Sequence, residues 1–481
     1  MNMRATVLSA LKWTVIGRVA TQAVSWVVTI VVMRLLVPDD YGLVAMATLF
    51  SGLFSVVSEI GMGSSITQSK EVTPRQVQQV YGVVLLSNLV IFLLLALAIA
   101  PLASAFFDEP RVGPVIQVVA LQFIPAAFAV IPSAMLDRDM EYRGRAFIDF
   151  LSVACGALIT LVMADQGFGA FALAWGNVAA GTLRVVGLNL IKPYRAWPVF
   201  NFSGVGHMVR FGRDVAANRL VYYFYSQADS LIIGKLLGKH DLGLYSVSMS
   251  LASMPASKLA VTIDQVAFPA LSKVKREGGQ VSQYVLKSLR GVSLLSFPVM
   301  WGMSCVAPEL VRVLIGETWV PATTALALLC LVMPLRVLGP IFHAGLQSVG
   351  RANVSFRNTC TMAVAMCLAF VVGCQFGLLG LAMSWVIVFP LVFFFNAYRA
   401  SRHLGLTLVD IVGALYRPVL ASAVMYGSVY ALRPVLDIPL LAVLVVLIAT
   451  GAMAYLLATL LINRGGVMEA WRLLRPASKP D

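Results

Sequence analysis

Long apolar stretches follow one another along almost the whole chain, and they restrict its fold more than any other feature. A helix that crosses a bilayer needs about 20 consecutive apolar residues. Fourteen such stretches, separated by proline, glycine and charged residues, lie near residues 10–36, 41–62, 79–101, 113–135, 147–164, 168–190, 211–236, 241–267, 283–306, 321–345, 357–375, 378–398, 409–432 and 437–463. The chain is therefore expected to be an all-α polytopic membrane protein with about fourteen transmembrane helices.

The composition leads to the same class. Only 12% of the residues are charged and 59% are hydrophobic, whereas a soluble domain carries roughly 25% charged residues. A soluble chain of this kind would expose large apolar patches and aggregate. The N-terminal stretch is interpreted as an uncleaved first span and not as a signal peptide, because its apolar core is too long and contains Lys12 and Arg18.

The basic residues of the short loops predict the orientation of the chain. With a cytoplasmic N-terminus, 19 Lys and Arg residues fall in inside segments and four in outside segments. Short loops rich in Lys and Arg stay on the cytoplasmic side, so both termini are expected in the cytoplasm, in a bacterial inner membrane. The net charge of +14 then belongs to membrane loops, and no nucleic-acid partner is expected.

The sequence also repeats. RLLVPDDYGL at 34–43 returns as KLLGKHDLGL at 235–244, an offset of 201. The same offset relates charged residues of the first and seventh spans, pairing Lys12 with Arg213 and Arg18 with Arg219. Spans 1–6 and 7–12 are therefore interpreted as two six-helix lobes related by a pseudo-two-fold axis along the membrane normal, an architecture typical of secondary transporters. The predicted parts are an N-terminal lobe at 1–200, a C-terminal lobe at 201–400, two additional helices at 401–463 and a cytoplasmic tail at 464–481.

Charged side chains inside the apolar spans are the main functional signal. A charge at the bilayer centre costs at least about 2.5–3.5 kcal/mol, so such a residue faces the protein interior or water. Arginine stays ionised and binds phosphate oxygens through two parallel hydrogen bonds, so an arginine-lined cavity suits an anionic substrate. The cationic candidates are Lys12, Arg18, Arg213, Arg219, Arg290 and Arg336. The acidic candidates, for a coupling cation or an ion pair, are Glu59, Asp214 and Asp229.

Structural roles remain as alternatives at several of these positions. A basic residue close to the end of a span, such as Lys12, can extend to the interface without any ligand. Arg18 and Arg219 lie deeper and occupy equivalent places in the two copies. They are expected either to face the cavity or to form structural ion pairs.

Enzyme motifs are absent from the sequence. There is no GxxxxGK[ST], HExxH or GxSxG, and neither the four histidines nor the six cysteines show metal-ligand spacing. No catalytic residue, cofactor or metal is expected. Transport would then draw on an ion gradient, the membrane potential or downstream consumption. The alternatives are a cation-coupled drug exporter, which predicts an acidic aromatic cavity, and a glycan polymerase or ligase, which predicts a large periplasmic loop.

Three motifs resemble a known family. RLLVPDDYGLVAMA at 34–47, FPALSKV at 268–274 and GETWVPA at 316–322 are similar to the WzxC-like branch of the oligosaccharide-lipid (Wzx) flippases, in the multidrug/oligosaccharidyl-lipid/polysaccharide (MOP) exporter superfamily. The resemblance covers about residues 5–400. It implies a flippase that moves an undecaprenyl-pyrophosphate-linked oligosaccharide from the cytoplasmic to the periplasmic leaflet, for exopolysaccharide, capsule or O-antigen (lipopolysaccharide) assembly. It implies alternating access of a cavity lined by Arg18 and Arg219. The implied partners are the lipid-linked substrate, membrane lipids, and a polysaccharide polymerase and co-polymerase.

Overall fold

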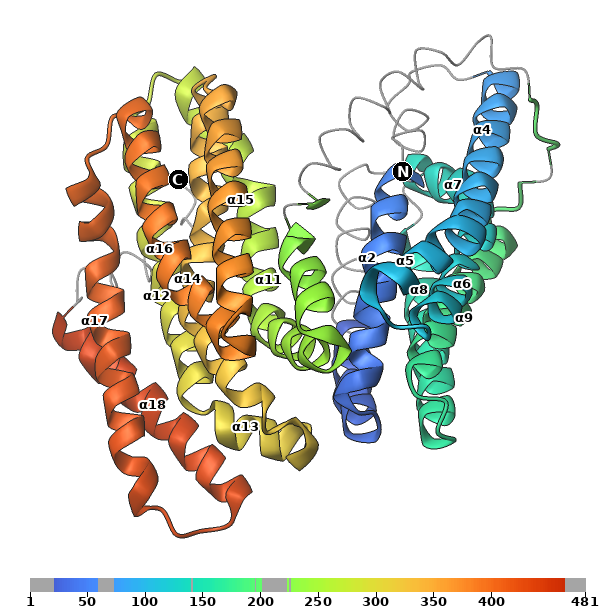
Figure 1. The fold of residues 1–481 in the computed structure, drawn as a ribbon. Helices are drawn as coiled ribbons and strands as arrows, with labels where there is room; N and C mark the ends of the chain where they lie inside the picture. Colours follow the sequence, from blue (N-terminus) through green and yellow to red (C-terminus); the bar gives the residue numbers. More distant parts are fainter. Residues whose placement is uncertain are drawn as a thin grey trace. The chain divides into compact units, whose positions relative to one another are not determined.

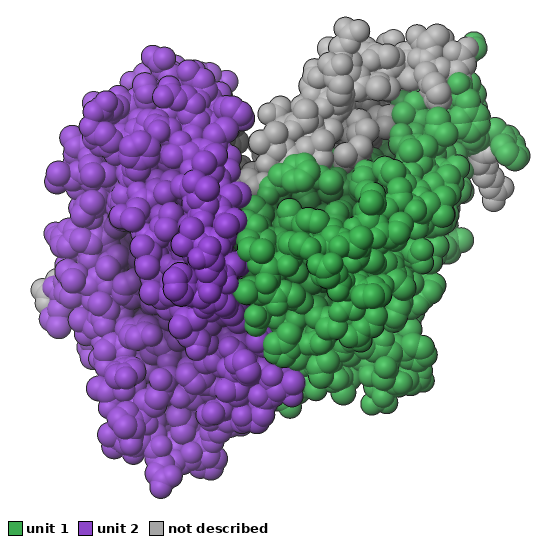
Figure 2. All heavy atoms as spheres, in the orientation of Figure 1, with its two compact units in different colours: residues 1–243 green, residues 244–481 purple. Residues whose placement is uncertain are grey.

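The structure is a computed structural model, which describes residues 21–58, 73–139, 142–194, 196–200, 223–224 and 226–462. Every regular element in this part of the chain is a helix (Figure 1). The chain divides into two compact units, residues 1–243 and 244–481 (Figure 2). The lobes at 1–200 and 201–400, the two additional helices and the tail stay a prediction.

In unit 1 an apolar helix covers Thr21–Leu35. The helices that follow are α2 (Pro38–Ser58), α4 (Pro74–Leu93), η1 (Leu94–Ile99), α5 (Ala100–Phe107), α6 (Val112–Ala120), α7 (Phe123–Asp139), α8 (Tyr142–Asp165) and α9 (Ala170–Ile191). A further helical segment occupies 226–236. Helix α11 (Gly238–Arg276) contains the boundary between the two units, after Gly243. The remaining helices belong to unit 2: α12 (Val281–Cys305), α13 (Ala307–Leu314), η2 (Glu317–Trp319), α14 (Ala322–Ser348), α15 (Ala352–Cys374), α16 (Gly377–Leu404), α17 (Leu408–Leu432), η3 (Arg433–Val435) and α18 (Leu440–Ile462).

Local sequence explains how the long helix of residues 74–107 begins and where its hydrogen-bond pattern changes. Thr73 caps its N-terminus: the side chain accepts a hydrogen bond from the Gln76 amide, and Gln76 bonds back to Thr73. The π-helical turn η1 precedes Pro101, which has no N–H to continue the α-helical pattern. The Ala100 amide there bonds to the Leu95 carbonyl, five residues back.

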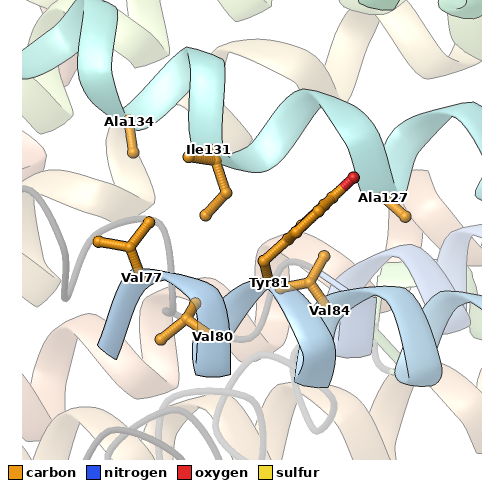
Figure 3. Packing of buried hydrophobic residues seen from close by; sticks show 7 residues of the cluster. All are labelled: Val77, Val80, Tyr81, Val84, Ala127, Ile131 and Ala134. Atoms are coloured by element: carbon orange, nitrogen blue, oxygen red, sulfur yellow. The ribbon is translucent and has the colours of Figure 1, made fainter. Parts of the chain in front are cut away.

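Helix α4 packs on α7 through one face of each helix (Figure 3). The buried residues recur every three or four positions, the spacing of one helical face. They are Val77, Val80, Tyr81 and Val84 on α4, and Ala127, Ile131 and Ala134 on α7. The small alanines allow the two backbones to approach closely, as is usual between transmembrane helices.

Small residues also hold α8 against α9. A side chain at Gly176 would overlap the Thr160 hydroxyl, and one at Gly156 would meet the Ala180 methyl group. Thr160 donates its own hydroxyl hydrogen bond to the Gly156 carbonyl at 2.9 Å. The close packing of α8 on α9 therefore leaves no room for a side chain at either glycine.

The predicted spans can be compared with the observed helices. Among the described residues, nine helices are long and apolar enough to cross a membrane, or ten if α12 and α13 count as one bent span. The chain is thus a multi-pass membrane protein, while the count of fourteen stays a prediction. The predicted outside loop after residue 306 contains α13, which turns by 72° from α12.

Two loops predicted at 136–146 and 269–282 are shorter than expected. Helix α7 continues to Asp139 and α8 begins at Tyr142, while α11 runs on to Arg276. Lys273, Lys275 and Arg276 occupy the last turn of α11. Basic residues there favour helix, because they oppose the negative C-terminal end of the helix dipole.

The two helices predicted as additions, α17 and α18, pack within unit 2. Tyr455 on α18 donates a hydrogen bond to the Leu294 carbonyl on α12 at 2.7 Å. Arg433, in the turn between α17 and α18, pairs with buried Glu309 at 2.9 Å. The same guanidinium also bonds to the Cys305 carbonyl. These contacts attach both helices to α12 and α13.

Candidate functional site

The two copies of the repeated motif meet each other where α2 and α11 begin. A side chain at Gly42 would overlap the Lys239 carbonyl, and a side chain at Gly243 would overlap the Pro38 carbonyl. Gly243 follows Gly42, and Lys239 follows Pro38, by the repeat offset of 201. The contact is therefore reciprocal, as in a two-fold interface where the same patch is used twice. We call this contact, with its surrounding charges, the repeat junction.

Several polar and charged side chains of the repeat junction contact one another. Nδ1 of His240 lies 2.8 Å from Oδ1 of Asp39, and these two residues are also 201 apart. Nζ of Lys239 lies 2.5 Å from a Glu109 carboxylate oxygen and 3.8 Å from Asp39. Lys235 pairs in the same way with Asp108, at 2.7 Å. The junction thus joins the start of α2, the turn after α5 and the start of α11 by both backbone contact and ion pairs.

Glu109 has the best-defined electrostatic setting at the junction. Partial burial alone would raise the pKa of its carboxyl group. The hydrogen bond and charge of Lys239, together with hydrogen bonds from Arg111, outweigh this effect and lower the pKa below its ordinary value of 4.5. Glu109 is therefore held in the charged state that Lys239 requires.

A second polar site lies inside unit 2, around Arg336. This residue is in the middle of α14 and half-buried. Its Nη1 lies 3.3 Å from the sulfur of Met249 on α11, and its guanidinium carbon lies 4.6 Å from the ring centre of Trp385 on α16. We call this set the Arg336 site.

The Arg336 site has no neutralising acid in the part of the chain that the structure describes. No described carboxylate lies within 4.0 Å of its guanidinium. Trp385 is held in place by a hydrogen bond from its Nε1 to the Tyr245 hydroxyl at 2.9 Å. A thioether is a weak acceptor, and an aromatic face attracts a cation without removing its charge. The site can therefore bind an anion.

Proline also shapes the backbone at this site. Pro340 has no N–H, so it cannot donate the helical hydrogen bond that the Arg336 carbonyl would otherwise accept. Pro334, six residues earlier, removes another helical hydrogen bond, the one that the Cys330 carbonyl would accept. Interruptions of this kind are tolerated in transmembrane helices and allow them to bend.

The other predicted site residues fall in different places. Lys12, Arg18, Glu59, Arg213, Asp214 and Arg219 lie outside the described residues. Arg290 is exposed on α12 and lies within electrostatic range of Asp410, at the start of α17. Asp229 is buried, and its carboxylate accepts hydrogen bonds from the amide and hydroxyl groups of Ser230. Among the described residues, Arg290, Arg336 and Asp229 thus lie in separate surroundings.

Sequence reasoning missed the neighbours of Arg336. Met249 and Trp385 are far from it along the chain, and neither belongs to a motif. The two prolines on either side of Arg336 are a usable sequence signal, since they mark an interrupted helix at a charge inside an apolar span. The reciprocal contact of Gly42 and Gly243 could have been suspected from the repeat, because both glycines follow the same pattern.

The fold is that of membrane exporters. The lipid II flippase MurJ, in an inward closed conformation, aligns with a TM-score of 0.76 and 12% identity over 96% of this chain and 100% of its own. A multidrug resistance transporter of the MATE family, from the MOP superfamily, aligns with a TM-score of 0.57 and 13% identity over 79% of this chain and 95% of its own. At these identities the likeness concerns the fold.

Residues 31–324 match the family model described as polysaccharide biosynthesis protein, and the chain belongs to this family. WzxC, a lipopolysaccharide biosynthesis protein of Escherichia coli (strain K12), is 25% identical over 81% of this chain and 79% of its own length. ExoT, a succinoglycan biosynthesis transport protein of Rhizobium meliloti (strain 1021), is 25% identical over 80% of this chain and 77% of its own length. The resemblance to WzxC-like proteins of the MOP superfamily is thereby confirmed, and these relatives agree with a non-enzymatic membrane protein.

Proposed function

We infer that this protein is a flippase, which moves a lipid-linked oligosaccharide across the inner membrane during bacterial polysaccharide assembly. The observation that carries this inference is Arg336, a charge inside a membrane span without an acidic partner among the described residues. Membership of the polysaccharide biosynthesis family and the exporter fold support it. The two relatives above are named for lipopolysaccharide and succinoglycan biosynthesis.

The chemistry of such a substrate matches this setting. A lipid-linked pyrophosphate carries about two negative charges, and neither it nor a polar glycan enters hydrocarbon without large cost. A guanidinium has five N–H donors for phosphate oxygens and stays charged. The Trp385 ring covers one face of the Arg336 guanidinium. The N–H donors at the edge of the guanidinium can then replace part of the water that the pyrophosphate loses.

The repeat junction suits a reversible closure. Close glycine contact excludes solvent, while the ion pairs around it are partly exposed and individually weak, so they can separate without large cost. Alternating access would open and close this contact. An inside-negative membrane potential would assist export of an anion by roughly 2.3 kcal/mol per charge per 100 mV.

The other charged residues predicted from the sequence complete the proposed binding site. Arg18 and Arg219 contact the pyrophosphate from equivalent places in two six-helix lobes, with Lys12, Arg213 and Arg290 as further cations. Glu59, Asp214 and Asp229 pair with arginines or carry a coupling cation. The carrier lipid is undecaprenyl pyrophosphate, and polymerase and co-polymerase act on the exported unit. A drug exporter would instead place carboxylates where Arg336 lies.

The orientation is tested by labelling. In a cysteine-free background, Glu277→Cys should be protected from an impermeant thiol reagent in intact cells, because the turn after α11 is cytoplasmic. Asp108→Cys, in the turn after α5, should be labelled. Labelling of the cysteine at position 277 in intact cells would contradict cytoplasmic termini.

The function is tested by replacing Arg336. We expect surface-polymer export to fall in the order wild type, Arg336→Lys, Arg336→Ala, Arg336→Glu, with equal amounts of protein in the membrane. Alanine removes charge-assisted contacts worth roughly 1.5–3 kcal/mol, and lysine keeps the charge but loses the planar fork. Arg417→Ala is the matched control, because this exposed arginine on α17 contacts Tyr416. Normal export by a well-expressed Arg336→Glu protein would contradict the assignment.

A further inference from the structure

The chain has no acidic residue between Glu317 and Asp410, yet this stretch holds five arginines, Arg336, Arg351, Arg357, Arg399 and Arg402. Apart from Arg336, all of them lie in or beside α15 and α16. These two helices are joined by only two residues, so they run antiparallel, and the start of α15 lies beside the end of α16. The four arginines therefore collect at the end of this helix pair opposite its connecting turn.

Arg399 is held in a defined orientation by neutral groups. Its Nη1 donates hydrogen bonds to the Asn358 side-chain oxygen and to the Thr361 hydroxyl, each at 3.2 Å. Its guanidinium carbon lies 4.8 Å from the ring centre of Phe395, one turn earlier on α16. These partners position the side chain but leave its positive charge uncompensated.

The acceptors of Arg399 are themselves fixed. Asn358 is buried and donates to the Asn396 backbone carbonyl at 3.2 Å, while Asn396 donates to the Asn358 backbone carbonyl at 3.0 Å. Thr361 donates its hydroxyl proton to the Arg357 carbonyl at 2.8 Å. This network joins α15 to α16 and places Arg399 before any ligand arrives.

Other arginines of unit 2 form ion pairs within the protein, as expected of a structural role. Arg433 pairs with Glu309 at 2.9 Å, and Arg312 pairs with Glu317 at 3.6 Å. Within the described part of the chain, Nε and Nη2 of Arg399 have no hydrogen-bond partner. Arg402 stacks on Tyr398 and bonds to its hydroxyl, again without an acid. Arg399 and Arg402 therefore keep their positive charge without an acidic partner among the described residues.

The surface next to the arginines is apolar and exposed. Leu368 on α15 is 65% exposed, and Leu391 on α16 is 67% exposed. Phe395, between Leu391 and Arg399 on the same face of α16, is half-exposed. In a membrane protein such a band contacts acyl chains, and the arginines stand where it ends.

We propose that this end of α15 and α16 binds the phosphate of an anionic phospholipid, with its acyl chains along the apolar band. Arg399 supplies the oriented guanidinium, and Arg357 and Arg402 add charge at the rim. A basic residue that only extends to the interface is mobile and prefers no lipid. The fixed fork of Arg399 instead matches phosphate oxygens, which arginine binds through two parallel hydrogen bonds.

The test measures lipid binding by the full-length protein in neutral detergent, using native mass spectrometry. Phosphatidylglycerol should bind in preference to phosphatidylcholine. Arg399→Gln should weaken phosphatidylglycerol binding roughly tenfold or more, since a charge-assisted contact is lost. Arg399→Lys should fall between the two, and Arg417→Gln, a matched loss of one exposed charge on α17, should bind as wild type does.

Four results would overturn the proposal. Arg399→Gln could keep its preference for phosphatidylglycerol, or Arg417→Gln could lose it equally, which would indicate a diffuse charge effect. Inorganic phosphate without lipid could raise the melting temperature in an Arg399-dependent way, which would indicate a free-anion site. If Arg399→Gln does not fold, Arg402→Gln serves instead, because the polar and ring contacts of its guanidinium among the described residues are with Tyr398, on its own helix. Unchanged lipid binding by that variant would also contradict the proposal. None of these measurements depends on transport.

Discussion

The repeat junction and the Arg336 site treat charge in opposite ways. At the junction, Lys239 lies against both Glu109 and Asp39, and Lys235 lies against Asp108. At the Arg336 site, an arginine in the middle of a span is surrounded by sulfur and aromatic groups. The junction satisfies its charges internally, whereas the Arg336 site leaves a positive charge for another molecule.

This difference indicates different roles. The repeat junction holds helices of the protein together, whereas the Arg336 site is suited to binding a ligand. Paired charges near the surface add little energy each, so the junction depends mainly on backbone proximity at its glycines. A half-buried cation inside a membrane span, without an acidic partner among the described residues, is costly. Its retention makes sense where a bound anion offsets that cost.

The largest effect is expected from Gly42→Ala and Gly243→Ala at the junction. Each added methyl group would overlap a backbone carbonyl, which cannot rotate away as a side chain can. Overpacking of this kind costs about 1–3 kcal/mol, so the closed junction should become roughly 5- to 150-fold less populated. Crosslinking between cysteines placed at Asp39 and His240 measures this population.

Gly181→Ala on α9 is the control for the glycine experiment. A side chain there would meet nothing within 4 Å, and alanine favours helix. Crosslinking should therefore stay at the wild-type level. Equal crosslinking in Gly42→Ala and wild type would show that the junction does not depend on glycine.

Next in size is the effect of Trp385→Leu on the Arg336 site. The substitution removes the ring beneath the guanidinium, and cation–π contacts are worth roughly 0.5–2 kcal/mol. Export should fall roughly 2- to 30-fold, while Trp385→Phe should retain part of it. The double variant with Arg336→Ala should be no worse than Arg336→Ala alone. Additive losses would mean that Trp385 acts independently of Arg336.

A smaller effect is expected from the ion pair of Lys239 and Glu109. A double-mutant cycle with Lys239→Ala and Glu109→Gln should give a coupling of at most about 1 kcal/mol, the usual range for partly exposed pairs. Thermal unfolding in detergent at low and high salt would measure it, with the coupling weakening as salt rises. A coupling several times larger would indicate that charge, and not backbone contact, closes the junction.

The smallest effect is a pH dependence at the same pair. The pKa of Glu109 is lowered in the folded protein, so its stabilising contribution is present above its ordinary value of 4.5 and is lost as the pH falls through the folded pKa. Crosslinking across the junction should therefore weaken below about pH 4.5 in wild type. Glu109→Gln should show a flatter profile over the same range. Identical acid profiles would show that another group controls the loss.

Much of the architecture was predictable from periodicity alone. Most described helices coincide with predicted spans, because about 20 apolar residues between polar breaks admit few folds other than a membrane helix. The π-helical turn before Pro101 and the 72° bend before α13 were not predicted. Both depend on local backbone geometry that hydropathy does not record.

The sequence by itself determined the class of protein, the helical architecture, the family and the candidate charges inside the spans. Only the tertiary structure decided which of those charges are neutralised: Lys239 meets Glu109 from 130 residues away, while Arg336 meets Trp385 and Met249. Hydropathy and repeat offsets depend on neighbours along the chain. Charge compensation depends on distances across space, because electrostatic energy falls with the separation of the groups.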